Sequence, residues 1–353
     1  MFLSICIPQY NRTNFLIESL RSFSKQLFKD FEVCISDGGS TDGGLPAIEN
    51  FLTNSGMRYK LRRSDKNFHY DENLRSSISM SEGKYILLMG NDDALADANT
   101  LTFLKDLLDI NSPVAVAITN YHELSTGKDY RRMTRTGMVG AGPAMAAASF
   151  RHYAFVSGII MDGPSARAAA TDQCDGGEMY QMYLGARLIA SGGRFLAIDK
   201  ICVLKDIQIP GQFVDSYRDK PRLSPCPVIE RPLPMGKILH TVALGIDSVA
   251  SGVERERSIS LVAKQLYKFT YPFWIFEYRR VQSFNYALGV YFALRPSRTM
   301  ENIRIPFSTR INSWLIYISA GVIGFLTPLC FFDAARPFLY AIAKRGRKLL
   351  EST

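Results

Sequence analysis

The chain has 353 residues, of which 47% are hydrophobic and 21% are charged. This length and composition suffice for one large or two ordinary globular domains, and they exclude wholesale disorder. The mean hydropathy is close to zero, and one uncharged run approaches the roughly 20 residues that a spanning helix needs, so a polytopic membrane protein is excluded as well.

The surplus of positive charge sits at one end of the chain. Overall, 42 Lys and Arg against 33 Asp and Glu give a net charge of +9. Residues 1–253 carry 27 side chains of each sign, whereas residues 254–353 carry 15 basic and 6 acidic ones. The C-terminal part is therefore a basic module.

The six cysteines are scattered without a CxxC pair, and the first residues, MFLSICIP, lack the basic segment and the full apolar core of a signal peptide. We therefore expect a reducing, cytosolic environment with free thiols.

Short apolar segments alternate with helical patterns from the N-terminus onward. Strands are expected at 3–8, 31–36, 57–61, 84–89, 114–120 and 154–161, and helices at 13–28, 42–52, 71–80, 99–108 and from about 177. This alternation predicts an α/β fold with a mostly parallel sheet, helices on both faces, and a ligand site at the carboxyl ends of the strands.

Polar turns follow three of these strands: PQYNR at 8–12, SDGGSTDG at 36–43 and LMGNDD at 88–93. Asp37 precedes two glycines, which let a ligand approach the backbone, so its carboxylate is suited to a nucleotide base or ribose. The alternative is that Asp37 and Ser40 make turn and cap contacts, with Asp42 opening the next helix.

Asp92 and Asp93 are adjacent carboxylates that repel each other unless a cation or a hydrogen-bond network offsets their charge. Their oxygens suit Mn²⁺ or Mg²⁺, and a cation completed by substrate phosphates is typical of a nucleotide-diphosphate leaving group. The alternative is a helix-capping pair.

In their order and spacing, SICIPQYNR, CISDGGSTDGG, DKNFHYDENL and SEGKYILLMGNDDAL resemble the family 2 glycosyltransferases, and among them the O-antigen abequosyltransferase branch. The resemblance covers about residues 1–210 and implies the GT-A fold. It implies that Pro8 and Tyr10 line the nucleotide pocket and that Asp37 contacts the base or ribose.

The resemblance also implies a metal site. Asp92 matches the second acidic position of the family's metal motif, Gly90 stands at the first, and Asp93 is put forward as a helping ligand. A similar glycine precedes the acidic pair in the abequosyltransferase-like branch.

In the family, an acidic residue near a later helix start deprotonates the acceptor hydroxyl, often as the second member of a Glu-Asp pair. In TDQCDGGEM at 171–179, Glu178 matches the first member and Met179 replaces the second. The base is thus Glu178 or Asp175, and we favour Glu178. The alternative is that Glu178 only complements a helix dipole.

Other site classes lack their motifs. The sequence has no GxGxxG after the first strand, no GxxxxGK[ST], no GxSxG and no HExxH, which excludes dinucleotide-binding, P-loop, α/β-hydrolase and zinc readings.

After a linker at 211–234, the pattern of 235–353 is helical and basic. Helices are expected at 235–250, 257–269 and 271–294, and residues 313–332 form an uncharged run with basic residues on both sides. Because both flanks favour the cytoplasmic side, we expect a monotopic or re-entrant membrane anchor, bent at its glycines and proline. The alternatives are a buried helix pair of a soluble domain and nucleic-acid binding.

Together these patterns predict an inverting, metal-dependent glycosyltransferase. It would transfer a sugar from a nucleotide-diphosphate donor to a lipid-linked (polyprenyl diphosphate) oligosaccharide of a surface polysaccharide, at the cytoplasmic face of the cell membrane and without a nucleic-acid partner. Two alternatives stay open. One is a nucleotidyltransferase, although PQYNR lacks its basic, glycine-rich signature, and the other is a non-catalytic membrane adaptor with a degenerate GT-A fold.

Overall fold

The structure, a computed structural model, describes residues 1–66, 68–212 and 234–348. The predicted linker at 211–234 lies almost entirely outside the described residues, as do the side chains of the basic cluster at 344–348.

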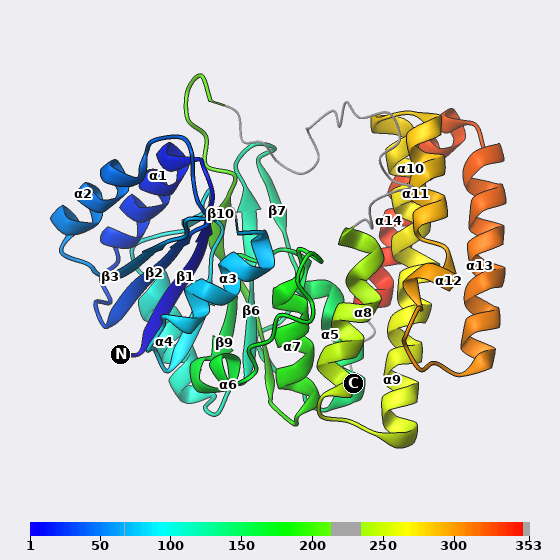
Figure 1. The fold of residues 1–353 in the computed structure, drawn as a ribbon, viewed down its shortest axis with the longest axis horizontal. Helices are drawn as coiled ribbons and strands as arrows, with labels where there is room; N and C mark the ends of the chain where they lie inside the picture. The colour runs from blue at the N-terminus through cyan, green and yellow to red at the C-terminus, as the bar shows by residue number, and fades with distance from the viewer. Residues whose placement is uncertain (67, 213–233, 349–353) are drawn as a thin grey trace.

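Within these residues, ten strands form one mixed sheet in the order β3-β2-β1-β4-β9-β6-β10-β5, with β7 beside β6 and β8 beside β10 (Figure 1). The strands are β1 (Leu3–Gln9), β2 (Phe31–Asp37), β3 (Arg58–Arg63), β4 (Tyr85–Leu88), β5 (Ala94–Leu95), β6 (Val116–Glu123), β7 (Lys128–Tyr130), β8 (Gly137–Gly140), β9 (Ile159–Asp162) and β10 (Phe195–Lys205). β1 is parallel to β2 and β4, and β6 is parallel to β10, whereas β9 runs antiparallel between β4 and β6. The predicted strand at 154–161 is shorter than expected because a 3-10 turn (Phe150–Ala154) precedes it.

Helices cover both faces of the sheet, as predicted. Leu3, Ile5 and Ile7 of β1 pack into a core with α1 (Thr13–Ser24), α2 (Leu45–Ser55) and α4 (Thr100–Ile110). The alternate residue Cys6 packs on the opposite face with α3 (Tyr70–Ser79). This period of two is expected for a strand that is buried on both sides.

Asp42 does not open α2, contrary to the sequence-based expectation. Its carboxylate accepts hydrogen bonds from the backbone N–H (3.1 Å) and the hydroxyl (2.8 Å) of Thr13, and thereby caps α1 from a distant turn. α2 begins later, at Leu45, after Gly44.

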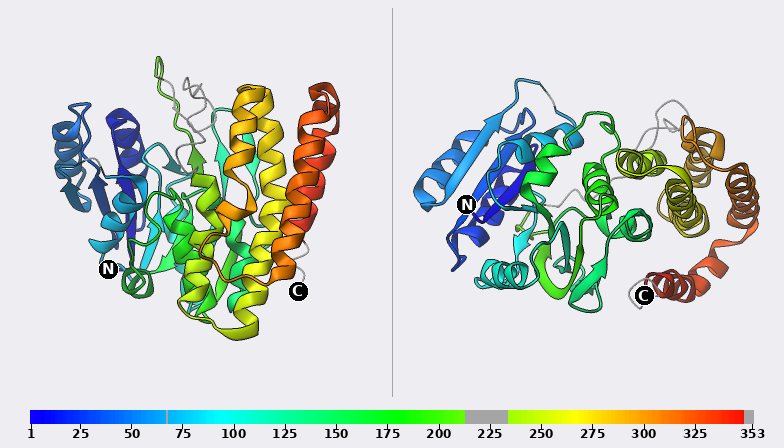
Figure 2. Two further views of the ribbon diagram at one scale, coloured as in Figure 1. Left: turned by 45° about the vertical axis from the view of Figure 1, so that its right-hand side comes forward. Right: turned by 90° about the horizontal axis from the view of Figure 1, so that it is seen from below.

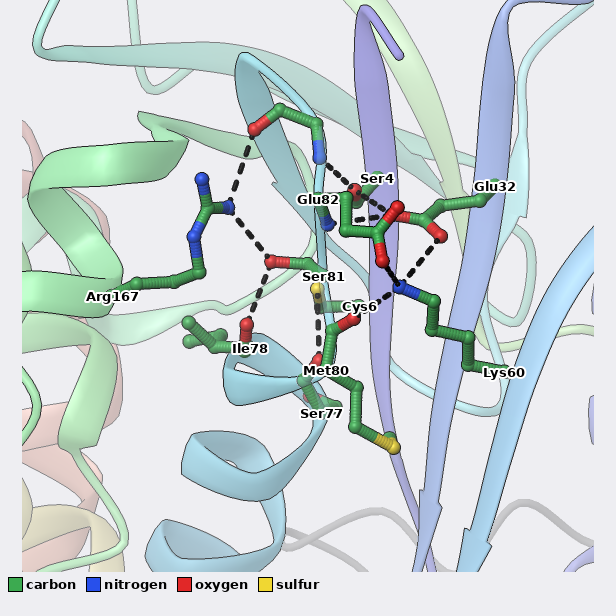
Figure 3. A network of polar contacts seen from close by, with 11 residues as sticks. Ser4, Cys6, Glu32, Lys60, Ser77, Ile78, Met80, Ser81, Glu82 and Arg167 are labelled. Carbon is green, nitrogen blue, oxygen red and sulfur yellow. Dashed lines mark hydrogen bonds and ion pairs between the residues drawn. The ribbon is translucent and has the colours of Figure 1, made fainter.

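A polar network closes the amino-terminal edge of the sheet (Figure 3). The buried Glu32 carboxylate accepts a hydrogen bond from the Ser4 hydroxyl (2.7 Å) and lies 3.5 Å from the Lys60 ammonium. Lys60 also donates to the Met80 carbonyl (2.8 Å), which ties β3 to the end of α3. Because buried charges need such partners, this cluster has a structural explanation.

The C-terminal region is helical in its described part, as predicted. It contains α8 (Pro234–Asp247), α9 (Gly252–Gln265), a π-helical turn (Leu266–Thr270), α10 (Tyr271–Val281), α11 (Phe284–Ala293), α12 (Pro296–Thr299), α13 (Phe307–Leu326) and α14 (Leu329–Lys348). α8 packs along α7 (Tyr180–Ala190), and α9 along α5 (Pro143–Ser149). One hydrophobic core therefore joins the sheet to these helices.

The apolar run at 313–332 is bent at its proline, as expected, but not at its glycines. α13 continues through Gly321 and Gly324, and the chain turns only after Leu326, at Thr327 and Pro328 (Figure 2). A Cβ at Gly321 would lie 2.5 Å from the Tyr291 ring, so this glycine serves close helix packing rather than a bend. Across the described ranges, none of the helices combines the length and apolarity needed to cross a membrane.

Candidate functional site

The three polar turns meet at one edge of the sheet, as predicted, because β1 lies between β2 and β4. Gln9 at the end of β1 joins them. Its carbonyl accepts a hydrogen bond from the Gly38 N–H (2.8 Å), and its side-chain oxygen accepts one from the Asn91 amide (2.7 Å). Sequence reasoning named Pro8 and Tyr10 and missed the residue between them, although its position at a strand end was the available signal.

Pro8 lies inside β1, opposite Ser36 of β2. Tyr10 follows the strand and its side chain is exposed. Both residues thus lie at the carboxyl edge, and their role as pocket walls stays a prediction.

The buried Asp37 carboxylate organises its own turn. It accepts hydrogen bonds from the N–H groups of Gly39 (3.1 Å) and Ser40 (2.9 Å) and from the Ser40 hydroxyl. The turn role that the sequence left open is therefore present, and contact with a base or ribose stays a prediction.

The start of α3 closes over this turn. The Asn73 amide donates to the Gln9 carbonyl (2.8 Å), and a Cβ at Gly38 would lie 3.0 Å from the Asn73 nitrogen and 3.1 Å from the Phe68 carbonyl oxygen. Gly38 therefore permits close packing of two backbone segments.

Two consecutive non-glycine residues after β1 adopt left-handed backbone conformations: Asn11 has φ 51° and Arg12 has φ 65°. The Asn11 N–H donates to the Ser40 hydroxyl (2.7 Å), and the Asn11 side-chain oxygen accepts from the Thr41 N–H (2.8 Å). Such strain costs on the order of 1 kcal/mol per residue and persists only where surrounding contacts enforce it.

This strained turn directs the Arg12 guanidinium to Asp92, with which it forms an ion pair. The Asp92 side chain is 16% exposed and that of Arg12 is 30% exposed, so the pair reaches solvent at the sheet edge. Burial raises the pKa of Asp92, and the Arg12 charge opposes that rise.

Asp93 faces the opposite way, into the protein. One oxygen accepts from the Asp206 N–H (3.0 Å), and the other accepts from the Ser157 hydroxyl, which in turn accepts from the Gly90 N–H (2.7 Å). Burial and the neighbouring Asp92 charge raise the pKa of Asp93. Asp92 is thus the member of the pair that reaches solvent at the sheet edge.

This donor set does not fit Mn²⁺ or Mg²⁺. A Cβ at Gly90 would lie 2.9 Å from an Asp93 oxygen and 3.0 Å from an Asp92 oxygen, so the position of the first acid has no room for a side chain. Asp37 and Asp92 lie at the ends of strands on either side of β1, and both oxygens of Asp37 already accept hydrogen bonds within its own turn. In the part of the chain that the structure describes, no three His, Cys, Asp or Glu side chains gather in a metal-binding group.

Asp71 of α3 holds the start of α7. Its buried carboxylate accepts hydrogen bonds from the N–H groups of Glu178 (2.8 Å) and Tyr180 (2.9 Å). Because Asn73 on the same helix contacts Gln9, this places the α7 start beside the sheet edge. Asp71 is a second residue that the sequence reasoning missed.

The two candidate bases differ in their surroundings. Asp175 pairs with the Arg75 guanidinium (2.9 Å for one of its contacts), whereas Glu178 is exposed and has a left-handed φ of 54°. Burial raises the pKa of Tyr70, and the charges of Asp71 and Glu178 raise it further. This geometry favours Glu178, and the assignment stays a prediction.

Solved structures share this architecture. The chain superposes on Staphylococcus aureus TarS residues 1–349 with a TM-score of 0.59 at 14% identity, over 90% of this chain and 91% of that one. The same TarS fragment in complex with UDP-GlcNAc gives 0.57 at 16% identity, over 100% and 91%. A mannosyltransferase of Pyrobaculum calidifontis, PcManGT, in complex with GDP-Man and Mn²⁺, gives 0.53 at 13% identity, over 92% and 87%. The fold is thus of the GT-A type.

Sequence comparison shows which family the N-terminal part of the chain resembles. Residues 4–161 match the model of glycosyl transferase family 2. The abequosyltransferase RfbV of Salmonella typhimurium is 38% identical over 116 residues, which are 32% of this chain and 34% of that protein. A PGL/p-HBAD biosynthesis glycosyltransferase of Mycobacterium tuberculosis is 33% identical over 110 residues, 31% of this chain and 43% of that protein. The matches thus span less than half the length of these curated relatives.

Proposed function

We propose that the protein is an inverting glycosyltransferase that transfers one sugar from a nucleotide-diphosphate donor to a lipid-linked oligosaccharide during surface polysaccharide synthesis. The observation that carries the proposal is the meeting of the three motif turns with the α7 start at one sheet edge. The family 2 match and the names of the relatives support it.

In the proposed reaction, the Glu178 carboxylate takes the proton of the acceptor hydroxyl. The acceptor oxygen attacks the anomeric carbon, and the bond from that carbon to the diphosphate oxygen breaks, with the electron pair leaving on the nucleoside diphosphate. The sequence also predicts Mn²⁺ or Mg²⁺ here. Because the donor set does not fit either ion, no step is assigned to a metal.

The test of the base is a transfer assay with a panel of UDP-, GDP-, CDP- and dTDP-sugars and lipid-linked oligosaccharide. We expect Glu178→Gln to lower the transfer rate by at least about 100-fold, as is usual for loss of a general base. Asp175→Asn should stay within about tenfold, and Glu49→Gln, at an exposed position on α2, is the control. Full activity of both the Glu178 and the Asp175 variants would show that neither is the base.

We further propose that α13 rests on the cytoplasmic face of the cell membrane. Its buried stripe consists of small or polar residues and one tyrosine, whereas large apolar side chains face outward. The buried residues are Ser313, Tyr317, Gly321 and Gly324, and the outward ones include Ile311, Leu315, Ile318, Val322 and Leu326. This distribution is the reverse of that on a water-exposed helix and supports contact with lipid.

A groove between α10 and α13 adds to this support. It has a volume of about 360 Å³, is lined mainly by apolar side chains such as Phe276 and Ile323, and includes Lys268. An apolar surface beside basic side chains suits an anionic bilayer.

Sedimentation with liposomes tests the membrane proposal. The liposomes contain phosphatidylcholine and about 30% of the anionic lipid phosphatidylglycerol. We expect the double variant Leu315→Glu and Ile318→Glu to lower binding at least about tenfold, because both side chains are exposed and their replacement leaves the core intact. Ile110→Glu, at an exposed position on α4, is the matched control. Equal binding of all three proteins would refute the assignment of α13.

A further inference from the structure

The candidate site holds a cation that the sequence motifs did not assign, the guanidinium of Arg12. Arg12 lies directly after β1 and forms an ion pair with Asp92. Asp92 matches the acidic position of the predicted metal motif and faces the sheet edge, whereas Asp93 faces the protein interior. An ion bound to the Oδ2 oxygen of Asp92 would therefore have to displace Arg12.

The backbone is shaped to put Arg12 there. Arg12 and Asn11 both have positive φ, and contacts from Ser40 and Thr41 of the neighbouring turn hold them so. Non-glycine residues adopt this backbone conformation at a cost in free energy. Its use at two consecutive positions therefore points to a functional orientation of the Arg12 side chain.

Other positive groups near Asp92 are less suited to bind an anion. Lys205 lies between the carboxylates of Glu123 (2.6 Å) and Asp206, whose two negative charges outweigh its own. The N-terminus of α1 is capped by the Asp42 carboxylate, which already uses the Thr13 N–H. Arg12 in turn is partly exposed, and a guanidinium can bind two phosphate oxygens at once.

We propose that Arg12 binds the diphosphate of the donor and supplies the positive charge that a divalent cation would otherwise provide. Asp92 is then the carboxylate that pairs with Arg12 when no donor is bound. The inference rests on the proposed function, because it requires a nucleotide-diphosphate donor at this edge.

The experiment measures binding of UDP, GDP, CDP and dTDP by isothermal titration calorimetry, in EDTA and in Mn²⁺. We expect the wild type to bind one of them in EDTA, with an affinity within about threefold of that in Mn²⁺. Arg12→Ala should weaken that binding by about 10- to 100-fold in both buffers, as expected for loss of charge-assisted hydrogen bonds. Arg12→Lys should recover part of the loss, and Arg21→Ala, on α1, should match the wild type.

Asp92→Asn separates the two roles of this site. If Arg12 binds the diphosphate, this variant keeps or strengthens binding in EDTA because the guanidinium is released from its counter-ion. If Asp92 instead holds a metal, the variant loses Mn²⁺-dependent binding, and Arg12→Ala binds Mn²⁺ more tightly than the wild type in a direct Mn²⁺ titration. Either of these last two results would overturn the inference.

The remaining outcomes are also decisive. Nucleotide binding that requires Mn²⁺ in the wild type would overturn the Arg12 proposal and leave the glycosyltransferase proposal standing. Failure of every nucleoside diphosphate to bind in either buffer would overturn both. Thermal melts of each variant establish that the comparison concerns folded protein.

Discussion

Replacing Asp71 should loosen the start of α7 and displace Glu178. The Asp71 carboxylate is fully buried and accepts two hydrogen bonds, from the Glu178 N–H (2.8 Å) and the Tyr180 N–H (2.9 Å). Neither amide has an intrahelical acceptor, because Glu178 precedes the N-cap Met179 and Tyr180 is the first residue of the helix. Asp71 therefore acts as a cap supplied by another helix.

The magnitude follows from these two bonds. In Asp71→Ala both amides lose their acceptor, one in a partly buried and one in a buried place, at about 1–3 kcal/mol each, which gives a loss of about 2–6 kcal/mol in the free energy of unfolding. In Asp71→Asn one acceptor oxygen remains and the buried charge is removed. Burial raises the pKa of Asp71, so the charge itself costs stability, and we expect a smaller loss of about 1–2 kcal/mol.

Urea denaturation measures both losses, and hydrogen exchange of the Glu178 and Tyr180 amides reports the position of the defect. Exchange of these amides should accelerate in both variants, while core strand amides such as those of β1 change only with global stability. Glu72→Gln, at the next position on α3, is the control. Unchanged exchange at these two amides together with a stability loss below about 0.5 kcal/mol would refute the capping argument.

Three further outcomes are expected. The folded protein holds the Asp93 proton up to a pKa of about 8, above the ordinary carboxyl value of 3.8. The free energy of unfolding therefore falls as the pH rises between these two values, by at most about 1.4 kcal/mol per pH unit. Asp93→Asn should flatten the pH profile of stability, measured by urea denaturation between about pH 5 and pH 8, and an unchanged profile would count against the buried proton. Gly38→Ala should cost about 1–3 kcal/mol and weaken nucleotide binding, because its Cβ would lie 3.0 Å from Asn73 and 3.1 Å from Phe68; wild-type stability and affinity would contradict the close packing. Arg75→Ala should cost about 1–2 kcal/mol by thermal melting, since it removes a partly buried ion pair with Asp175. If Arg75→Lys, which keeps the charge, is equally unstable, the loss comes from packing instead.

The sequence by itself determined the fold class and the edge of the sheet that carries the site. Apolar runs of six or seven residues such as that of β1, separated by helical periodicity, are consistent with a doubly covered sheet, and parallel strands bring their carboxyl ends together. The motif turns containing Asp37 and Asp92 therefore had to lie near each other.

Only the tertiary structure decided what each polar side chain contacts. Asp42 caps α1 instead of α2, and Asp93 turns inward to Ser157. Asp71 caps α7 although it lies more than a hundred positions earlier in the chain. The physical reason is that hydrogen bonds and ion pairs depend on distances of about 3 Å, which local periodicity along the chain does not encode. The pairing of Arg12 with Asp92, across 80 positions, is decided in the same way, by the strained turn after β1 and the order of the strands.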